Sequence, residues 1–434
     1  MATLKQGAKF PVDPLVLVTE HVDAEYRRRV VEGILESYHS NYDVVSEAVQ
    51  NAVDAVEDAK LTGLAEPYII EVTVDLSQNR IGILDTGVGM TLDEVASVFA
   101  PHVSLKQQSP AKTKRDRLSM YRGYKGVGLT FLAYGTDDII IHSKQAGILT
   151  KARMQYGRAW ATGERADPAV MVEDAGPSPL ESFPRGTFVQ VQFSESTRPK
   201  SLNKLASSAA TWTTILRTKT AIGQVLLGRE AVCPLKVKLN LVDGGKIESN
   251  NVDPVFLYPH EITRNPPFRF LDLVEYYQKH SEQTVPPQEK IRQDGVYFIW
   301  DSSRIEKELT AEQRGTYAKQ IKNYSPFLYA FIPYQGSVWS DLNKIATGVS
   351  RRTYLYPGLM IGVNRQRLAD IFEIDATRFE TFSRNVFVVV HLDEAKAGPG
   401  KKNNRSGGGE LRAKGSRSRG AIPSQTTSPS SASG

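Results

Sequence analysis

Hydrophobic and polar residues follow regular patterns along most of the chain. Alternation of the two classes predicts strands, and an apolar residue at every third or fourth position predicts helices. The helices expected from these patterns cover residues 22–36, 43–60 and 91–99 and the segment ASSAATWTTILRTKTAIG. The expected strands are YIIEVTVDL, NRIGILD, DDIIIHSK, GILTKARM and GTFVQVQF in the first half of the chain, and PLKVKLNLV, VYFIW, PFLYAFIPY, LMIGVNRQRL and RNVFVVVHL in the second.

A polar stripe runs along the helix expected over residues 43–60. Its members are Glu47, Asn51 and Asp54, separated by four and three positions. Because each residue of a helix advances by about 100°, these side chains fall within an arc of about 60°. A stripe of this kind is usually a solvated face, so its meaning depends on the motifs further along the chain.

Two glycine-rich turns follow this helix in the sequence. In ILDTGVGM, Asp85 ends an apolar strand, and Gly87 and Gly89 let the backbone approach a flat ligand closely. The glycines of GYKGVGL precede a helix, whose N-terminal N–H groups and dipole favour an anion such as a phosphate. Either turn alone is a weak signal, because ordinary strand-to-helix turns also contain glycine.

Taken together and in this order, the motifs are specific. EAVQNAVD, DTGVGM and GYKGVGL, with the closing strand GTFVQVQF, resemble the motifs of the GHKL ATPases, which include gyrase, the ninety-kilodalton heat-shock chaperones, histidine kinases and MutL. The resemblance covers roughly residues 22–193. It implies the Bergerat fold, an α/β sandwich in which helices cover one face of a mixed sheet, and it implies ATP and Mg²⁺ as ligands.

The resemblance also implies a role for each residue of the motifs. Glu47 is expected to be the general base that activates the attacking water, Asn51 to offer its amide oxygen to Mg²⁺, and Asp85 to accept a hydrogen bond from the adenine amino group. The other nucleotide-binding residues that it implies are Asp54, Gly87, Gly89, Met90 and Thr187 around adenine, and Lys125, Gly126, Val127 and Gly128 at the phosphates.

The chain is expected to divide into three parts. Residues 1–196 form the ATP-binding domain with a lid at 101–125, residues 197–395 form an α/β domain, and residues 396–434 form a disordered, basic tail rich in glycine and serine. LMIGVNRQRLAD in the second part resembles an element of the transducer domains of MutL and microrchidia proteins. That resemblance implies a basic residue that reaches the γ-phosphate, for which Lys401 or Lys402 is the candidate and Arg365 the next; alternatively, the two lysines simply begin the tail.

Positive charge is concentrated in two segments. The chain has 54 Lys and Arg against 48 Asp and Glu; the tail holds eight basic residues and one acidic residue, which leaves 46 basic and 47 acidic residues elsewhere. The lid has seven basic residues against Asp116. A basic lid suits a triphosphate or a nucleic-acid backbone, and Arg115, Arg117 and Arg122 could serve both. The tail could contact DNA or an acidic partner, or only add solubility.

Several classes of protein are excluded by composition. No apolar run approaches the roughly 18 residues of a membrane helix, and one cysteine, Cys233, cannot form an internal disulfide. We therefore expect a cytosolic or nuclear protein that does not enter a membrane. A histidine kinase is not expected, because only His21 and His39 precede the motif EAVQNAVD and leave no room for a phosphoacceptor module.

The sequence thus predicts a slow, Mg²⁺-dependent ATPase of the GHKL class. ATP would order the lid and favour a homodimer that acts as a clamp, with DNA or chromatin as a candidate target through the basic lid and tail. Two alternatives stay open: a chaperone-like remodeller of proteins, and a nucleotide-sensing subunit of a defence or signalling complex in which a partner subunit supplies the effector function.

Overall fold

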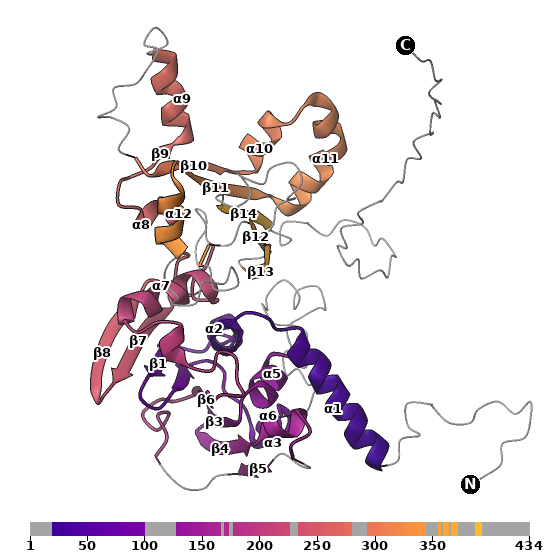
Figure 1. Ribbon diagram of the computed structural model, residues 1–434. Coiled ribbons are helices and arrows are strands. Elements are labelled where there is room, and N and C mark those ends of the chain that lie inside the picture. The colour runs from indigo at the N-terminus through magenta and orange to yellow at the C-terminus, as the bar shows by residue number, and fades with distance from the viewer. Residues whose placement is uncertain are drawn as a thin grey trace, which may run out of the picture. The chain divides into compact units, whose positions relative to one another are not determined.

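The computed structural model describes most of the chain between residues 20 and 392. The described ranges are 20–99, 127–165, 169–172, 177–225, 233–279, 293–343, 355–356, 359–363, 366–371 and 387–392. The expected lid and tail lie outside them, as do Lys125, Gly126 and Arg365. Two β-sheets are present in these ranges, one of eight strands and one of six (Figure 1).

The eight-stranded sheet is mixed. Its strands lie in the order β5-β4-β3-β6-β2-β1-β7-β8. All neighbours are antiparallel except β1 and β7, which are parallel. The bounds are β1 Ile69–Asp75, β2 Arg80–Asp85, β3 Asp138–Gln145, β4 Ile148–Gln155, β5 Ala169–Val172, β6 Gly186–Gln192, β7 Lys236–Asp243 and β8 Lys246–Val252.

Alternation along the strands separates a buried face of this sheet from a more exposed one. Ile70, Val72 and Val74 of β1 have no exposed surface, and Val72 pairs with Ile83 of β2 and Leu239 of β7. The residues between them, such as Glu71 and Thr73, are only half-buried. The period of two therefore gives one apolar face, which must be covered by another layer.

Helices cover that apolar face. The longest is α2, which contacts β1, β2 and β6 and buries Val44, Val45, Ala48, Val49, Ala52, Val53 and Val56; Figure 1 shows α5 beside it. The predicted fold class, a mixed sheet covered by helices, is confirmed. The helices are α1 Glu20–Glu36, α2 Asp43–Leu61, α3 Leu92–Ser97, α5 Gly128–Gly135, α6 Gly157–Ala161 and α7 Ala209–Lys219.

The first sheet extends further along the chain than the pattern of motifs suggests. PLKVKLNLV, which the sequence analysis places in the second part of the chain, forms β7 and pairs with β1. Strand β8 was not expected, because an edge strand with residues such as Lys246 and Glu248 exposed carries no alternating apolar pattern. The domain boundary at residues 196 and 197 stays a prediction, while the hydrogen-bonded sheet itself runs on to Val252.

The six-stranded sheet has the order β13-β12-β14-β11-β10-β9. LMIGVNRQRL, expected to be one strand, contributes to two antiparallel strands, β12 and β13. The segment between β8 and Asp294, for which no element was expected, contains α8, β9 and the amphipathic helix α9. The bounds are α8 Pro259–Ile262, β9 Phe268–Arg269, α9 Phe270–Lys279, β10 Gly295–Trp300, α10 Ser302–Glu308, α11 Ala311–Tyr324, β11 Phe327–Pro333, α12 Gly336–Asn343, β12 Leu359–Val363, β13 Gln366–Ile371 and β14 Phe387–Leu392.

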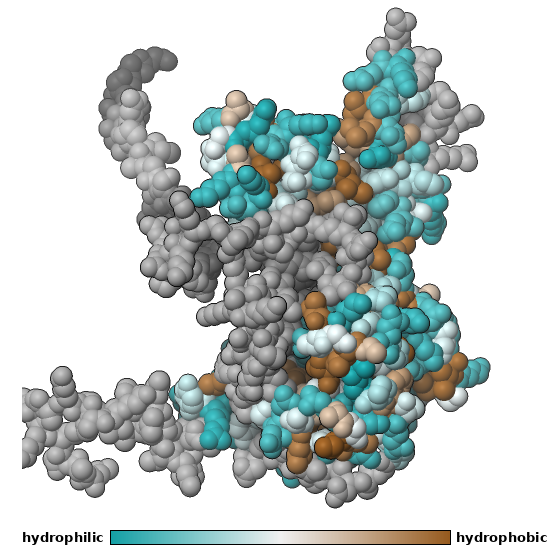
Figure 2. Space-filling view, turned by 180° about the vertical axis from the view of Figure 1, so that it is seen from behind, coloured by the Kyte–Doolittle hydropathy of each residue, from teal (hydrophilic) through white to brown (hydrophobic). Residues whose placement is uncertain are grey.

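Apolar residues on the surface are scattered. Figure 2 shows them on one face as separate small groups between polar residues, and the most exposed are Ile148 at 72% and Ile247 at 68%. This is the ordinary surface of a folded domain. No helix within the described ranges is long and apolar enough to cross a bilayer.

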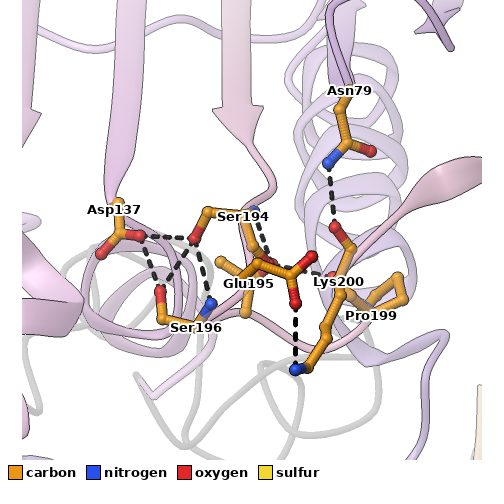
Figure 3. Close-up of polar contacts among 8 residues, drawn as sticks. Asn79, Asp137, Ser194, Glu195, Ser196, Pro199 and Lys200 are labelled. Atoms are coloured by element: carbon orange, nitrogen blue, oxygen red, sulfur yellow. Dashed lines mark hydrogen bonds and ion pairs between the residues drawn. The ribbon is translucent and has the colours of Figure 1, made fainter.

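Asn79, at the turn between β1 and β2, ties the segment after β6 to the sheet. Its backbone is left-handed, with φ of 51°, a conformation that asparagine tolerates. Its side-chain Nδ2 donates to the carbonyls of Phe193 at 3.0 Å and Lys200 at 2.9 Å, and its Oδ1 accepts from the N–H of Leu202 at 2.9 Å. Figure 3 shows the bond to Lys200.

A second contact holds the same segment from the other side. Asp137 Oδ2 accepts hydrogen bonds from the hydroxyls of Ser194 at 2.6 Å and Ser196 at 2.7 Å (Figure 3). The chain that leaves the sheet at the end of β6 is therefore fixed at both flanks before it enters α7.

Replacing Asn79 with alanine should destabilise the first sheet strongly. Asn79→Ala removes three hydrogen bonds and leaves an alanine at positive φ, so we expect a loss of about 2–4 kcal/mol in the free energy of unfolding. Gln78→Ala is the matched control, because Gln78 is exposed in the same turn; it should change stability by less than about 0.5 kcal/mol. Urea denaturation followed by circular dichroism measures both variants. Equal losses of unfolding free energy would contradict a stabilising role for the Asn79 side chain.

Candidate functional site

The polar stripe of α2 faces the first turn of α5. A Cβ atom at Gly128, the first residue of α5, would collide with Glu47 Oε2 and would lie 3.7 Å from Asn51 Nδ2. Glu47 and Asn51 are both half-buried, so they do not lie on a fully solvated face. The side chains that the sequence predicts for hydrolysis and for Mg²⁺ therefore lie together, beside the helix N-terminus predicted for the phosphates.

Asp85, at the end of β2, is a buried carboxyl group. Its side chain is 4% exposed, and Oδ1 accepts a hydrogen bond from the N–H of Gly87 at 2.8 Å. Burial raises the pKa of Asp85 from 3.8 to about 7, while hydrogen bonds from the backbone N–H groups of Gly87 and Thr187 act to lower the pKa. A carboxyl group so placed can accept a hydrogen bond from a ligand in a site from which water is largely excluded.

A small hydroxyl network lies beside Asp85. Thr187 of β6 pairs with Asp85 of β2 and with Ser143 of β3. The hydroxyls of Ser143 and Thr187 are 3.1 Å apart, and Ser143 Oγ accepts from the N–H of Met90 at 2.8 Å. The network fixes the turn after β2 to the middle of the sheet and gives this end of the site hydrogen-bonding groups.

The turn after β2 packs closely against α2 and β3. A Cβ at Gly87 would lie 2.6 Å from the carbonyl carbon of Ala55, and one at Gly89 would collide with the carbonyl oxygen of Lys144. Gly89 also has φ of +70°, which glycine adopts without strain. The turn can reach this position only with glycine at both places.

The structure brings most of the predicted residues together in two groups. One contains Glu47, Asn51 and Gly128, and the other contains Asp85, Gly87, Gly89, Met90 and Thr187. Asp54 is buried at 1% exposure, and Val127 precedes α5 and accepts the N–H of Phe131 through its carbonyl. Lys125, Gly126, Lys401, Lys402, Arg365 and the lid arginines lie outside the described residues, and the roles assigned to all these residues stay predictions.

Some residues of the site were not identified from the sequence. Ser143 carries a signal that could have revealed it, since it occupies an inward position of a strand whose other inward residues are Ile139 and Ile141. Ala55 packs closely on the turn: a Cβ at Gly87 would lie 2.6 Å from the Cβ of Ala55, and the Ala55 carbonyl accepts the N–H of Val88 at 3.3 Å. Tyr38 gave no such signal, because it lies in the connection before α2, outside any periodic pattern, and its contact with Glu47 is visible only in the folded structure.

The donor groups suit a magnesium ion that arrives with a nucleotide. Within the ranges that the structure describes, no group of three or more His, Cys, Asp or Glu side chains could hold a metal by itself. Mg²⁺ usually takes one or two protein oxygens and completes its shell with phosphates and water. The amide oxygen of Asn51 fits that pattern.

Comparison with known proteins agrees with this geometry. The family model described as histidine kinase-, DNA gyrase B-, and HSP90-like ATPase matches residues 38–183. Chaperone protein HtpG of Bacillus licheniformis is 28% identical over 163 residues, which are 34% of this chain and 25% of that protein. HtpG of Mycolicibacterium vanbaalenii is 25% identical over 194 residues, 42% of this chain and 28% of that protein.

These relatives match only one part of the chain. The HtpG of Alkalilimnicola ehrlichii, 26% identical over 149 residues, covers 30% of this chain and 21% of its own length. The chain thus spans about a quarter of the length of the curated relatives it matches. The family match, the order of the motifs and the mixed sheet with its covering helices identify residues 38–183 as an ATPase domain of the GHKL superfamily, with the Bergerat fold.

Proposed function

We propose that this chain binds ATP with Mg²⁺ at the described site and hydrolyses it slowly. The observation that carries the proposal is the contact of the α2 stripe with α5, which sets Glu47 and Asn51 against Gly128. A carboxylate, an amide oxygen and a helix N-terminus are the three groups needed for a water nucleophile, a hard cation and a phosphate.

The adenine end of the site is assigned to Asp85 and its neighbours. The ionised carboxylate accepts a hydrogen bond from the exocyclic amino group of adenine, and the hydroxyls of Thr187 and Ser143 add polar groups beside it. The turn with Gly87 and Gly89 offers a flat backbone surface to the ring. Selectivity for adenine follows, because guanine has a carbonyl oxygen where adenine has its amino group, and two acceptors repel.

The hydrolytic end is assigned to α2 and α5. Glu47 accepts a proton from the water that attacks the γ-phosphate, and the N-terminal N–H groups of α5, from Gly128 onward, bind phosphate oxygens. When bound, Mg²⁺ neutralises charge on the phosphates and is held by Asn51. Lys125 and Gly126, predicted at the phosphates, would extend this end of the site.

The proposed output of ATP binding is closure of a clamp. ATP orders the lid over residues 101–125, and a basic residue of the second part, Lys401 or Lys402 in the prediction, completes the site and favours a homodimer that closes as a clamp. The positive charge of lid and tail supports DNA as a target.

A chaperone-like remodeller is the second candidate function. The observation that favours it is the set of matched relatives, each of which bears the name chaperone protein HtpG. Client proteins would then replace DNA as the target, while the same ATP site and the same closure would operate.

Glu47→Gln should abolish turnover without abolishing binding. Because the amide cannot accept a proton from water, phosphate release should fall at least about 100-fold, while the affinity for MgATP measured by calorimetry should stay within about threefold. Glu36→Gln, at an exposed position at the end of α1, should leave both quantities unchanged. Turnover that survives Glu47→Gln would reject Glu47 as the base.

Asp85→Asn should weaken ATP binding, because the amide presents an NH₂ group and a neutral oxygen in place of a carboxylate acceptor. We expect the dissociation constant to rise at least about 30-fold, equivalent to roughly 2 kcal/mol. Asp138→Asn is the control, since that carboxylate, on β3, pairs with Arg153 of β4. An unchanged affinity in Asp85→Asn would remove Asp85 from the adenine site.

The same variant should change how stability depends on pH. The folded protein holds the Asp85 proton with a pKa of about 7, against 3.8 as the ordinary value, so folding gains stability from this group at low pH. That contribution, up to about 4 kcal/mol, is lost as pH rises from about 4 to about 7. Without ligand, Asp85→Asn should therefore gain stability relative to wild type at pH 8 but not at pH 4, as measured by urea denaturation.

Dimerisation should depend on ATP. We expect light scattering after size-exclusion chromatography to show a monomer without nucleotide or with ADP, and a dimer with ATP that accumulates in Glu47→Gln because closure is not reset. A protein that binds ATP, stays monomeric and releases no phosphate would favour the nucleotide-sensing alternative over the clamp.

A further inference from the structure

Tyr38 contacts the side chain that the proposed function makes the general base. Its hydroxyl donates a hydrogen bond to Glu47 Oε1 at 3.1 Å. Tyr38 lies in the short connection between α1 and α2, nine residues before Glu47 in the sequence. No other hydrogen bond of the Tyr38 hydroxyl is present within the described residues, so the phenol is directed at this carboxylate.

The ring of Tyr38 is fixed by α5. It stacks on the ring of Phe131 with centroids 3.7 Å apart and planes 14° from parallel. Phe131 is 7% exposed and lies in the first turn of α5. Because a stacked ring has little freedom about its two side-chain torsions, the position of the Tyr38 hydroxyl follows the position of α5.

The connection that carries Tyr38 is itself held in place. The N–H of Tyr38 donates to the carbonyl of Leu35 at 3.3 Å, the N–H of Ser40 donates to Asp43 Oδ2 at 2.7 Å, and the N–H of Tyr42 donates to Ser40 Oγ at 3.1 Å. Turns with this many local hydrogen bonds hold a single backbone path. The backbone of Tyr38 is therefore held by the turn and its ring by Phe131, and together they fix the position from which the hydroxyl reaches Glu47.

The second oxygen of Glu47 has a different neighbour. Oε2 lies where a Cβ of Gly128 would stand, against the start of the helix assigned to the phosphates. The carboxylate is thus held by Tyr38 through Oε1 and points its other oxygen toward α5. A side chain at position 128 would displace the carboxylate from this position.

The hydrogen bond also has a fixed direction. Burial and the negative charge of Glu47 raise the pKa of Tyr38 above its ordinary value of 10.0, and Asp43 adds to the effect. The phenol therefore stays protonated wherever the protein is folded and always donates. A hydrogen bond donated to a carboxylate favours its ionised form, which is the form that a general base needs.

We propose that Tyr38 is a positioning residue that holds the Glu47 carboxylate at the start of α5, through its hydrogen bond to Oε1 and its stack on Phe131. The proposal rests on the proposed function, since it assigns Tyr38 a role only through the base. It places the orientation of the base under the control of α5, so that a shift of the phosphate-binding helix moves the base with it. Tyr38 acts on the rate of hydrolysis and not on the binding of ATP.

Tyr38→Phe tests the contribution of the hydroxyl separately from that of the ring. It keeps the stack on Phe131 and deletes the hydrogen bond, so kcat for ATP hydrolysis should fall 10- to 100-fold, the size of loss that a misplaced catalytic group produces. The dissociation constant for MgATP should stay within twofold. Tyr26→Phe is the matched control: Tyr26 lies on α1 with 59% of its surface exposed, and its variant should equal wild type in both quantities.

A double variant distinguishes positioning from a general structural effect. In the background of Glu47→Gln, Tyr38→Phe should cause no further loss of the residual rate, because Tyr38 has no base left to position. A structural role would lower the rate again, or would weaken MgATP binding in Tyr38→Phe, and either result would overturn the proposal.

The roles of Glu47 and Tyr38 can be rejected independently. If Glu47→Gln leaves turnover intact, the proposed base is wrong whatever Tyr38→Phe does. If Glu47→Gln abolishes turnover while Tyr38→Phe keeps kcat within twofold of wild type, the base stands and the role of Tyr38 is rejected.

Discussion

The close packing of α2 against two glycine turns is the constraint on which the site depends. Apolar residues of α2, among them Val45, Val49 and Val53, have no exposed surface, so the distance from the helix to the sheet is set by a close-packed core. At that distance no side chain fits at Gly87, which lies against the backbone of Ala55. The same helix places Ala55 against the turn at Gly87 and Glu47 and Asn51 beside Gly128, so the packing that stabilises the domain also sets the positions of the site residues.

Much of this arrangement could be predicted from the sequence. Alternation of buried and less buried positions is clearest in β1 and β4, whereas β2 is buried along most of its length and was identified from its apolar run. The spacing of Glu47, Asn51 and Asp54 identified a stripe, and the glycine motifs gave that stripe a meaning. These signals are local, and local signals are what one sequence shows best.

The features that the sequence did not predict depend on contacts between segments of the chain. Strand β8 is a polar edge strand without a pattern, and β7 reads as an ordinary strand whose partner, β1, cannot be known from its own residues. Ser143 and Tyr38 lie outside the motifs and reach the site only through contacts made in the folded chain. A buried carboxyl such as Asp85 could be located from its place at a strand end, but the rise in its pKa follows from burial that only the structure shows.

The parallel pairing of β1 with β7 has a consequence for the order in which the domain is built. Ile69 pairs with Lys236 and Asp75 with Val242, so β1 receives its second neighbour only after the rest of the ATPase region has been synthesised. Until then, the N–H and C=O groups along one side of β1 form an open edge next to the strand that ends in Asp85, and open edges recruit other strands. The nascent chain therefore passes through a stage in which its motifs are complete but its sheet is not.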